Sequence, residues 1–289
     1  MIVFSGSSCA SLGRKIAKGK GLIPGKAKVE RFPDGEIYLR LVSPVKGEEC
    51  VLVQSTLGND NLVELLLFLD MLRDQGASSV HAVVPYFGYA RQDKSFNSGE
   101  ALSAKTSLKL MLSLTDSVTT INCHFLDREG VYKFHDLEIK NLDAFPLLAK
   151  YFKEHLKCPM LIAPDKGSLE YAKNAAEIIG CEFDFLQKKR LSGEKVEIQT
   201  KDLDVQGKDT LILDDMISTG GTIIEAAKLL KSQGASSVNA GCVHGVFSTG
   251  AERVRSAVDL LVCTDTLERG ISKVSVAQLI GKSLTQTTP

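Results

Sequence analysis

The chain has 289 residues, of which 44% are hydrophobic and 24% charged, a composition typical of a soluble globular protein with one large domain or two ordinary ones. Its 35 basic and 35 acidic residues cancel, which excludes a long-range attraction of the whole chain to nucleic acid, and its apolar runs are shorter than the roughly 20 residues of a membrane span. The apolar start precedes the first basic residues, the reverse of a secretory signal, and the seven cysteines contain no C-x-x-C pair. We therefore expect a cytoplasmic protein with reduced cysteines and with no nucleic-acid or membrane partner.

Short apolar segments that favour β-structure recur along the chain and are separated mostly by helical patterns. In the first half they are MIVFSG, EIYLRL, CVLVQS, SVHAVVPYF and VTTINC, and in the second half PMLIAP, CEFDFL, TLILDD, SVNAGCV and DLLVCTD. Strands that alternate with helices predict an α/β fold in which mostly parallel sheets are flanked by helices on both faces.

Two polar loops of the first half carry candidate binding residues. In RFPDGE, Phe32, Asp34 and Glu36 place an aromatic face and two hydrogen-bond acceptors on a turn, which suits adenine but also suits a plain P-D-G β-turn. After the strand SVHAVVPYF, the loop ends in a cluster from Arg91 to Lys94 that is able to stack on a purine and to donate hydrogen bonds to phosphate. A solvated loop after a strand is the alternative for this second segment.

The helical pattern between these loops, NLVELLLFLDML, is apolar almost all round. A helix of this kind lies either in the core or at a subunit contact. Asn61 and Glu64 predict a capping box at its start.

The hexapeptide QGASSV occurs twice, at 75–80 and at 233–238, each time after a helical pattern and before a strand. Gly76 and Gly234 stand where a helix commonly ends in the left-handed conformation that glycine adopts readily. Two copies so far apart favour a duplicated α/β unit over a solenoid, although a commonplace helix-to-strand turn could also recur by chance. A helical stretch near 143–153 leads into PMLIAP, so we expect one domain over residues 1–145 and a second over residues 146–289.

The stretch LILDDMISTGGT before the second copy has no counterpart before the first. Its apolar residues predict a buried strand, and Asp214 and Asp215 follow. The residues that lead from there into the next helix are Ser218, Thr219, Gly220, Gly221 and Thr222. Backbone N–H groups of a glycine loop at a helix N-terminus form an anion cradle, and carboxylates beside it favour a ligand with hydroxyl groups or a metal. The pattern therefore predicts a sugar phosphate site, with a tight strand-to-helix connection as the alternative.

This stretch resembles the diphosphate-sugar motif of the phosphoribosyltransferase superfamily, a hydrophobic strand followed by two acids and T-x-G-T. Over essentially its whole length the chain resembles the ribose-phosphate pyrophosphokinase family, and its archaeal members most. The other segments that carry the resemblance are RFPDGEIYLRL, NDNLVELLLFLDML, PYFGYARQDK, APDKGS, KKRLSGEKVEI, TDT and KVSVAQLI. The resemblance implies two tandem phosphoribosyltransferase-like, Rossmann-like domains. It also implies transfer of the diphosphate of ATP to the anomeric hydroxyl of ribose 5-phosphate, which gives 5-phosphoribosyl 1-diphosphate and AMP.

The same resemblance assigns residues to two binding sites. The expected ATP-binding residues are Phe32, Asp34, Glu36, Arg91, Gln92 and Asp93, and the expected ribose 5-phosphate-binding residues are Asp214, Asp215 and the loop 218–222. In the family the RFPDGE loop reaches into the ATP site of the neighbouring subunit. A homo-oligomer with its ATP site at the subunit interface is therefore implied.

Mg²⁺ is the implied metal, with His124 of INCHF and Asp165 of APDKGS as the matching ligands. A lone histidine is more often structural, and only its match in position to the family's histidine favours a ligand. The chain departs from the family pattern D-L-H-A, because Asn122 stands where an acid is usual. Either the metal site is less acidic here or Asp127 compensates.

Lys188 and Arg190 of LQKKRLSGEKVEI match the family's mobile catalytic loop. Alternate residues of an extended segment lie on one side of it, which leaves Lys189 on the other. Cations that close over the triphosphate would neutralise charge on the phosphoryl oxygens and exclude water. A solvated run of charges is the alternative.

Two other functions compete with this one. A phosphoribosyltransferase would share LDDMISTGGT, but it would use neither the RFPDGE nor the ARQDK loop. A non-catalytic homologue would keep the fold and bind ligand without turnover, and the changed surroundings of His124 keep that alternative open.

Overall fold

The computed structural model of this chain describes residues 1–157, 159–164, 168–190, 196–199 and 203–286. Contacts between residues divide the chain into two compact units. The first unit holds Met1–Asp143 together with Thr266–Glu268 and the segment from Ser275 onward, and the second holds Ala144–Asp265 together with Arg269–Val274.

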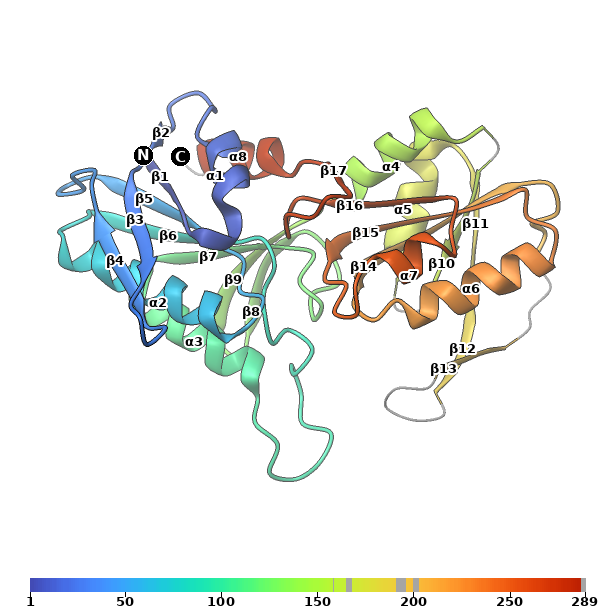
Figure 1. The fold of residues 1–289 in the computed structure, drawn as a ribbon, viewed down its shortest axis with the longest axis horizontal. Coiled ribbons are helices and arrows are strands. Elements are labelled where there is room, and N and C mark those ends of the chain that lie inside the picture. Colours follow the sequence, from blue (N-terminus) through green and yellow to red (C-terminus); the bar gives the residue numbers. More distant parts are fainter. Residues whose placement is uncertain (158, 165–167, 191–195, 200–202, 287–289) are drawn as a thin grey trace. The chain divides into compact units, whose positions relative to one another are not determined.

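The first unit is built on a seven-stranded sheet in the order β2-β1-β5-β6-β7-β9-β8, with every pair parallel except β8 and β9. Its strands are β1 (Ile2–Ser5), β2 (Ile23–Pro24), β5 (Glu49–Val53), β6 (Ser79–Val84), β7 (Ser117–Ile121), β8 (Gly130–Phe134) and β9 (Leu137–Leu142). A separate antiparallel hairpin consists of β3 (Ala27–Arg31) and β4 (Ile37–Leu41). The helical elements are η1 (Ser7–Cys9), α1 (Ala10–Ile16), α2 (Asn59–Asp74), α3 (Ser103–Leu114) and α8 (Ala277–Thr285). Figure 1 shows α1 and α8 on one face of the sheet and α2 and α3 on the other.

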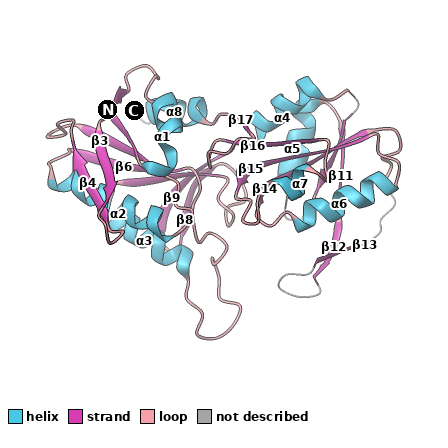
Figure 2. Cartoon of the chain, viewed as in Figure 1, coloured by secondary structure: helices cyan, strands magenta, loops and turns pink. Residues whose placement is uncertain are grey.

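The second unit is built on a six-stranded, all-parallel sheet in the order β11-β10-β14-β15-β16-β17. Its strands are β10 (Pro159–Ala163), β11 (Glu182–Phe185), β14 (Asp209–Ile217), β15 (Ser237–Gly245), β16 (Leu260–Thr264) and β17 (Ser272–Val274). An antiparallel ribbon consists of β12 (Gln187–Arg190) and β13 (Val196–Gln199). The helices are α4 (Phe145–His155), α5 (Leu169–Ile179), α6 (Gly221–Ser232) and α7 (Glu252–Arg255). In Figure 2, helices lie on both faces of the strands in this unit as in the first, which confirms the predicted fold class.

Apart from the edge strand β8, the two sheets have the same strand order. Taken position by position, β2, β1, β5, β6, β7 and β9 of the first unit occupy the places of β11, β10, β14, β15, β16 and β17 of the second. The helix that follows β5 is α2, and the helix that follows β14 is α6. The chain therefore contains the same α/β unit twice, as the repeated hexapeptide predicts.

Both copies of QGASSV form the same helix-to-strand turn. Gly76 and Gly234 have φ angles of 82° and 87°, the left-handed conformation that ends α2 and α6. Gly76 O accepts the N–H of Gly47 at 2.7 Å, and Gly234 O accepts the N–H of Gly207 at 2.8 Å. Each turn is thus tied in the same way to the loop before the neighbouring strand.

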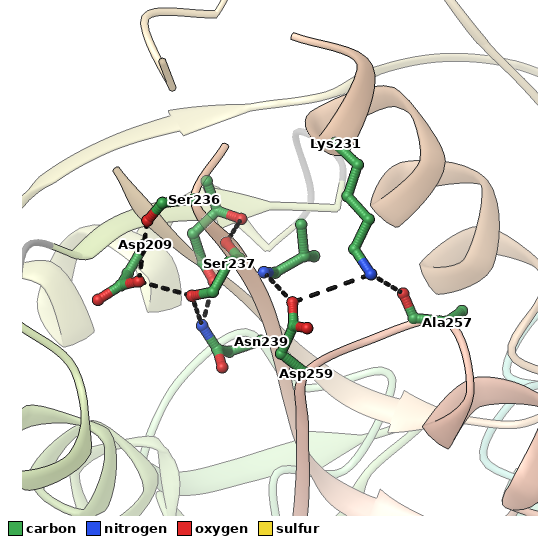
Figure 3. Close-up of polar contacts among 9 residues, drawn as sticks. Asp209, Lys231, Ser236, Ser237, Asn239, Ala257 and Asp259 are labelled. Atoms are coloured by element: carbon green, nitrogen blue, oxygen red, sulfur yellow. Dashed lines mark hydrogen bonds and ion pairs between the residues drawn. The ribbon is translucent and has the colours of Figure 1, made fainter. Parts of the chain in front are cut away.

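An aspartate and a cation complete each turn. In the first copy, Asp116 Oδ2 accepts the N–H of Val80 at 2.7 Å while Asp116 Oδ1 lies 2.7 Å from Nη2 of Arg73. In the second copy, Asp259 Oδ2 accepts the N–H of Val238 at 2.8 Å. The same oxygen lies 3.9 Å from Nζ of Lys231, and Figure 3 shows this ion pair. Neither aspartate is part of the hexapeptide, so sequence identity understates how closely the two turns agree.

The C-terminal segment packs with the first unit, since α8 contacts α1. Glu268 Oε1 also accepts the N–H of Leu12 at 2.7 Å, across 256 residues of chain. The domain boundary after residue 145 stays a prediction. The contacts also show that the chain returns to the first unit near its C-terminus. Within the ranges described above, no helix has the length and apolarity needed to cross a membrane.

The predicted capping box at the start of α2 is wrong. The helix begins at Asn59, its N-cap is Gly58, and no side chain caps it. Asn61 Nδ2 instead donates to Leu57 O at 2.5 Å, and the carboxylate of Glu64 turns inward to accept the N–H of Ser7 at 2.6 Å. The backbone N–H of Ser7, on another loop, therefore takes the carboxylate that the local pattern assigned to the cap.

Candidate active site

The acid pair lies near the carboxyl end of β14, the third strand in the order of the second sheet. Leu213 is buried, whereas Asp214 and Asp215 are half-buried. Asp214 Oδ1 accepts the N–H of Asp215 at 2.9 Å, and Asp215 Oδ1 accepts the N–H of Met216 at 2.7 Å. Pairing with β15 carries the strand on to Ile217, so the acids lie within the strand rather than directly after it.

A glycine loop connects β14 to α6. Gly220 is the N-cap of α6 with φ 79° and ψ 1°, and no side chain caps the helix. A Cβ atom at Gly220 would lie 2.1 Å from Cγ2 of Val254, so both the backbone angle and the packing require glycine there. Ser218 and Thr222 flank this turn as half-buried hydroxyls. The resulting helix N-terminus has the geometry of an anion site.

A second loop, after β15, lies against the glycine loop. The N–H groups of Phe247 and Ser248 donate to the carbonyls of Ile217 (3.0 Å) and Ser218 (3.1 Å). Thr249 Oγ1 also donates to the carbonyl of Thr219, at 3.4 Å. Sequence reasoning missed this support, although a second S-T-G triplet after an apolar strand, in GVFSTG, marks it.

In the first unit, the place of the acid pair is filled by other residues. The pairing of β5 with β6 has the same register as that of β14 with β15, so Gln54 and Ser55 take the places of Asp214 and Asp215. Ser55 Oγ donates to the carbonyl of Thr266 at 2.6 Å.

The loop after β1 closes the same place from another side. Gln54 Oε1 accepts the N–H of Ser8 at 3.1 Å and the hydroxyl of Ser8 at 2.7 Å. A Cβ atom at Gly6 would lie 2.3 Å from Gln54 Oε1. The chain itself therefore occupies the strand ends of the first unit that correspond to the acid pair and glycine loop of the second.

The RFPDGE segment forms the tip of the β3–β4 hairpin. The N–H of Phe32 donates to the carbonyl of Glu36 at 2.9 Å, and the N–H of Glu36 donates to Asp34 Oδ1 at 3.1 Å. Arg31 holds the tip through the carbonyl of Gly35 (2.8 Å), and its guanidinium lies 2.9 Å from a carboxylate oxygen on α2. Phe32 remains 48% exposed. The hydrogen-bonded turn thus holds an exposed aromatic ring. A β-turn and an adenine-binding loop are therefore compatible interpretations of RFPDGE.

The ARQDK segment follows β6 on a different loop of the first unit. Arg91 is exposed, and Gln92 and Asp93 are half-buried. The backbone of Gln92 accepts the N–H of Ala104 (3.2 Å) and donates to the carbonyl of Tyr89 (2.9 Å). These bonds fix the loop and leave the Arg91 side chain exposed to solvent.

The end of this loop is closed by Glu100, which sequence reasoning missed. Its carboxylate accepts the N–H of Phe96 at 2.6 Å, the N–H of Asn97 at 3.1 Å and the side-chain amide of Asn97 at 2.5 Å. The Asn97 side chain and then these backbone donors hold the pKa of Glu100 below its usual value. Lys94 Nζ lies 5.5 Å from the centroid of the exposed Phe96 ring.

The predicted metal ligands are described only in part. His124 follows β7 and is exposed, whereas Asp165 lies outside the described residues. Among the residues that the structure describes, no group of three or more His, Cys, Asp and Glu side chains is arranged to hold a metal.

The predicted catalytic residues lie on the β12–β13 ribbon, for which the structure gives the backbone. Lys188 is paired with Ile198, and Arg190 with Val196. The two cations therefore occupy alternate positions of one strand, as the sequence predicts.

Comparison with known proteins shows which protein families share this architecture. Residues 138–278 match the model of the phosphoribosyl transferase domain, and residues 1–114 match that of the N-terminal domain of ribose phosphate pyrophosphokinase. The fold, the acid pair and the glycine loop define a protein of the phosphoribosyltransferase class.

Full-length relatives narrow the class to one family. Ribose-phosphate pyrophosphokinase 2 of Archaeoglobus fulgidus is 42% identical and covers 94% of this chain and 96% of its own length. The ribose-phosphate pyrophosphokinase of Methanothermobacter thermautotrophicus is 44% identical over 88% of this chain and 89% of its own. The crystal structure of phosphoribosylpyrophosphate synthetase from Mycobacterium smegmatis has a TM-score of 0.83 at 26% identity and covers 98% of this chain and 97% of its own. The chain belongs to the ribose-phosphate pyrophosphokinase family.

Proposed function

We propose that this chain transfers the diphosphate of ATP to the anomeric hydroxyl of ribose 5-phosphate and so forms 5-phospho-α-D-ribose 1-diphosphate and AMP for nucleotide biosynthesis. The observation that carries the proposal is the acid pair of β14 beside the glycine loop at the N-terminus of α6. Relatives named ribose-phosphate pyrophosphokinase, which match most of the chain, support it. The expected cytoplasmic location is part of the proposal.

Ribose 5-phosphate binds at the second unit. The N–H groups of residues 218–222 and the start of α6 hold the 5-phosphate, because unpaired N–H groups and the helix dipole both favour an anion. Asp214 and Asp215 accept hydrogen bonds from the sugar hydroxyls. A neutral sugar ring between the carboxylates and the phosphate separates charges that would otherwise repel.

ATP binds at the first unit, and a second copy of the chain completes the ATP site. Arg91, Gln92 and Asp93 provide a planar cation, an amide and an acceptor on one fixed loop. The exposed Phe32, with Asp34 and Glu36 beside it, stacks on the adenine bound to a neighbouring subunit. The active form is therefore a homo-oligomer.

We expect Phe32→Ala to raise the KM for ATP about tenfold, because stacking of a base on an aromatic side chain contributes roughly 1–3 kcal/mol. The KM for ribose 5-phosphate should stay unchanged, since that site lies in the second unit. Steady-state kinetics with each substrate varied in turn measures both constants. Val42→Ala, at another exposed apolar side chain of the same unit, serves as the control. Unchanged ATP kinetics in the Phe32 variant would contradict the shared site.

Of the two assigned residues, Asp165 is the carboxylate that Mg²⁺ prefers, and nucleotide phosphates would provide further oxygen ligands. Mg²⁺ is commonly bound through one or two carboxylates and substrate phosphates rather than by a dedicated protein cage. We assign His124 and Asp165 as the protein ligands. When bound, the metal neutralises charge on the phosphoryl oxygens.

Lys188 and Arg190 act on the transferred group. The anomeric hydroxyl attacks the β-phosphorus in line with the departing AMP, and negative charge on the phosphoryl oxygens must be matched as it shifts. Two cations brought to the triphosphate from one strand of the β12–β13 ribbon provide this match. Their arrival also excludes water, which suppresses hydrolysis of ATP.

The carboxylates of the acid pair test the sugar site. We expect Asp214→Asn and Asp215→Asn each to weaken binding of ribose 5-phosphate by about tenfold, since a hydrogen bond to a charged group contributes roughly 1.5–3 kcal/mol. Asparagine Oδ1 can still accept the backbone N–H that each aspartate accepts now, so the fold should persist. Titration calorimetry measures the affinity, and normal binding by both variants would make the acids structural.

Product analysis tests the proposed reaction itself. The purified protein is incubated with ATP, Mg²⁺ and ribose 5-phosphate, and the nucleotides are separated by ion-exchange chromatography. AMP that forms only with the sugar, together with the sugar diphosphate, supports the proposal. Formation of ADP would indicate a simple kinase, and ligand binding without turnover would indicate a non-catalytic homologue.

A further inference from the structure

The ends of β7 and β9 bring an amide and a carboxylate together beside the His124 loop. These parallel strands pair Thr120 with Asn141 and Ile121 with Leu142, so the next residues, Asn122 and Asp143, are neighbours. The N–H of Asn122 donates to Leu142 O at 2.9 Å, and Asn122 Nδ2 donates to Asp143 Oδ1 at 2.8 Å.

The pair is part of the frame that holds this loop. Asn122 is 2% exposed and has φ 37°, in the left-handed region that asparagine and aspartate tolerate best among residues other than glycine. Directly after it, the N–H of Cys123 donates to Asn141 Oδ1 at 3.0 Å, and Asn141 Nδ2 donates to the carbonyl of Arg128 at 2.8 Å. The loop between Cys123 and Arg128 is thus tied at both ends, with His124 exposed between them.

Asp143 differs from its partner in exposure and charge. It is half-buried, whereas Asn122 is buried, so the carboxylate lies on the solvent side of the pair. It follows the last residue of β9, at the carboxyl edge of the sheet where open α/β folds bind their ligands. Asp127, the other acid near His124, is exposed on the loop itself.

We propose that Asp143 is the carboxylate that positions the His124 loop for its metal and nucleotide, with Asn122 as the hydrogen-bonded link between them. The inference rests on the proposed function, because it assigns Asp143 a part in that reaction. It also identifies Asp143, rather than Asp127, as the acid that compensates for the amide at position 122. The negative charge lies one strand away from where the sequence pattern places it.

The charge can be removed or moved without a change of shape. In Asp143→Asn, an amide oxygen can still accept the hydrogen bond of Asn122, so the variant removes the charge and keeps this link. In the exchange variant Asn122→Asp/Asp143→Asn, an amide and a carboxylate face each other again with their positions swapped. Aspartate at position 122 tolerates the left-handed backbone as asparagine does. Asp136→Asn is the matched control, because Asp136 is exposed in the β8–β9 turn and asparagine suits its φ of 66°.

The experiment compares wild type with the Asp143→Asn, Asp127→Asn, Asp136→Asn and exchange variants. We expect Asp143→Asn to lower kcat by about 10–100-fold, the usual effect of removing a group that orients a metal ligand. Calorimetry with a non-hydrolysable ATP analogue and Mg²⁺ should show a loss of affinity of similar size, while thermal unfolding stays close to wild type. The exchange variant should regain most of both quantities, and the Asp127 and Asp136 variants should behave as wild type.

Three results would overturn the inference. The first is an Asp143→Asn variant with the kcat and analogue affinity of the wild type. The second is an exchange variant as impaired as Asp143→Asn, and the third is a loss of kcat and affinity in Asp127→Asn instead. Failure of the proposed function is a separate result, since wild-type protein would then form no AMP from ATP and ribose 5-phosphate. If no AMP forms, the calorimetric comparison of analogue binding still tests the role of Asp143. Absence of analogue binding by the wild type would count against that role.

Discussion

Replacement of Lys188 by alanine should lower kcat by about a thousandfold, or roughly 4 kcal/mol of transition-state stabilisation. The physical reason is that the cation meets charge that shifts among the phosphoryl oxygens only as the diphosphate is transferred. An interaction made only in the transition state lowers kcat and leaves ground-state binding of the sugar unchanged. We therefore expect the affinity for ribose 5-phosphate, measured by calorimetry, to stay at the wild-type value.

The neighbouring residue provides the control for this experiment. Lys189 is paired with Glu197 in the same ribbon and occupies the intervening position of β12. Lys189→Ala removes the same charge from the same strand and should keep most of the activity. Wild-type turnover in the Lys188 variant would contradict the catalytic assignment. An equal loss in both variants would indicate an effect of total charge rather than of position.

Gly220→Ala should damage both the stability of the second unit and its sugar phosphate site. The new Cβ atom would lie 2.1 Å from Cγ2 of Val254, on a residue whose φ is 79°. Left-handed backbone costs an L-residue about 1–2 kcal/mol, and an overpacked contact costs about 1–3 kcal/mol more. We expect the free energy of unfolding in urea to fall by about 2–5 kcal/mol. Affinity for ribose 5-phosphate should fall at least about tenfold, because displaced N–H groups lose a charged hydrogen bond.

Two further variants separate the causes of this effect. Val254→Ala in the Gly220→Ala background removes the clash but not the backbone strain, so it should restore only part of the stability. Gly221→Ala is the control for both causes, since its Cβ atom would meet nothing closer than Thr219 Oγ1 at 3.9 Å and its φ is not positive. Its free energy of unfolding should stay near wild type. A Gly220 variant as stable as wild type would show that the loop adapts and that glycine is not required.

Most of the fold could be predicted because its signals are local. Alternating apolar strands and helices indicate a parallel sheet wherever they occur, and the two copies of QGASSV each hold a glycine that ends a helix. The predicted sugar phosphate loop is also contiguous, running from Asp214 to Thr222. A strand, a turn and a helix N-terminus within one short segment are local features, so the sequence predicts an anion site there.

The local patterns failed where a distant partner competes for the same group. Asn61 and Glu64 fit a capping box, but the N–H of Ser7 takes the Glu64 carboxylate. In the same way β14 continues through the acid pair because β15 pairs with it as far as Ile217. The buried Glu64 carboxylate is satisfied by the N–H and the hydroxyl of Ser7, and a buried carboxylate without partners would cost more than a missing cap.

Long-range contacts bring distant segments together at each candidate site, and no local pattern predicts them. Ser55 donates to the carbonyl of Thr266 across 211 residues, and Asn122 donates to Asp143 between strands that are neighbours only in the sheet. The loop after β15 lies on the glycine loop for the same reason. The two α/β units, the order of their elements and the composition of the 214–222 loop depend on neighbouring residues, and the sequence therefore predicts all three. The supporting carboxylate at Asp143 and the closure of the first unit's strand ends depend on which strands lie side by side, and the folded chain alone determines that.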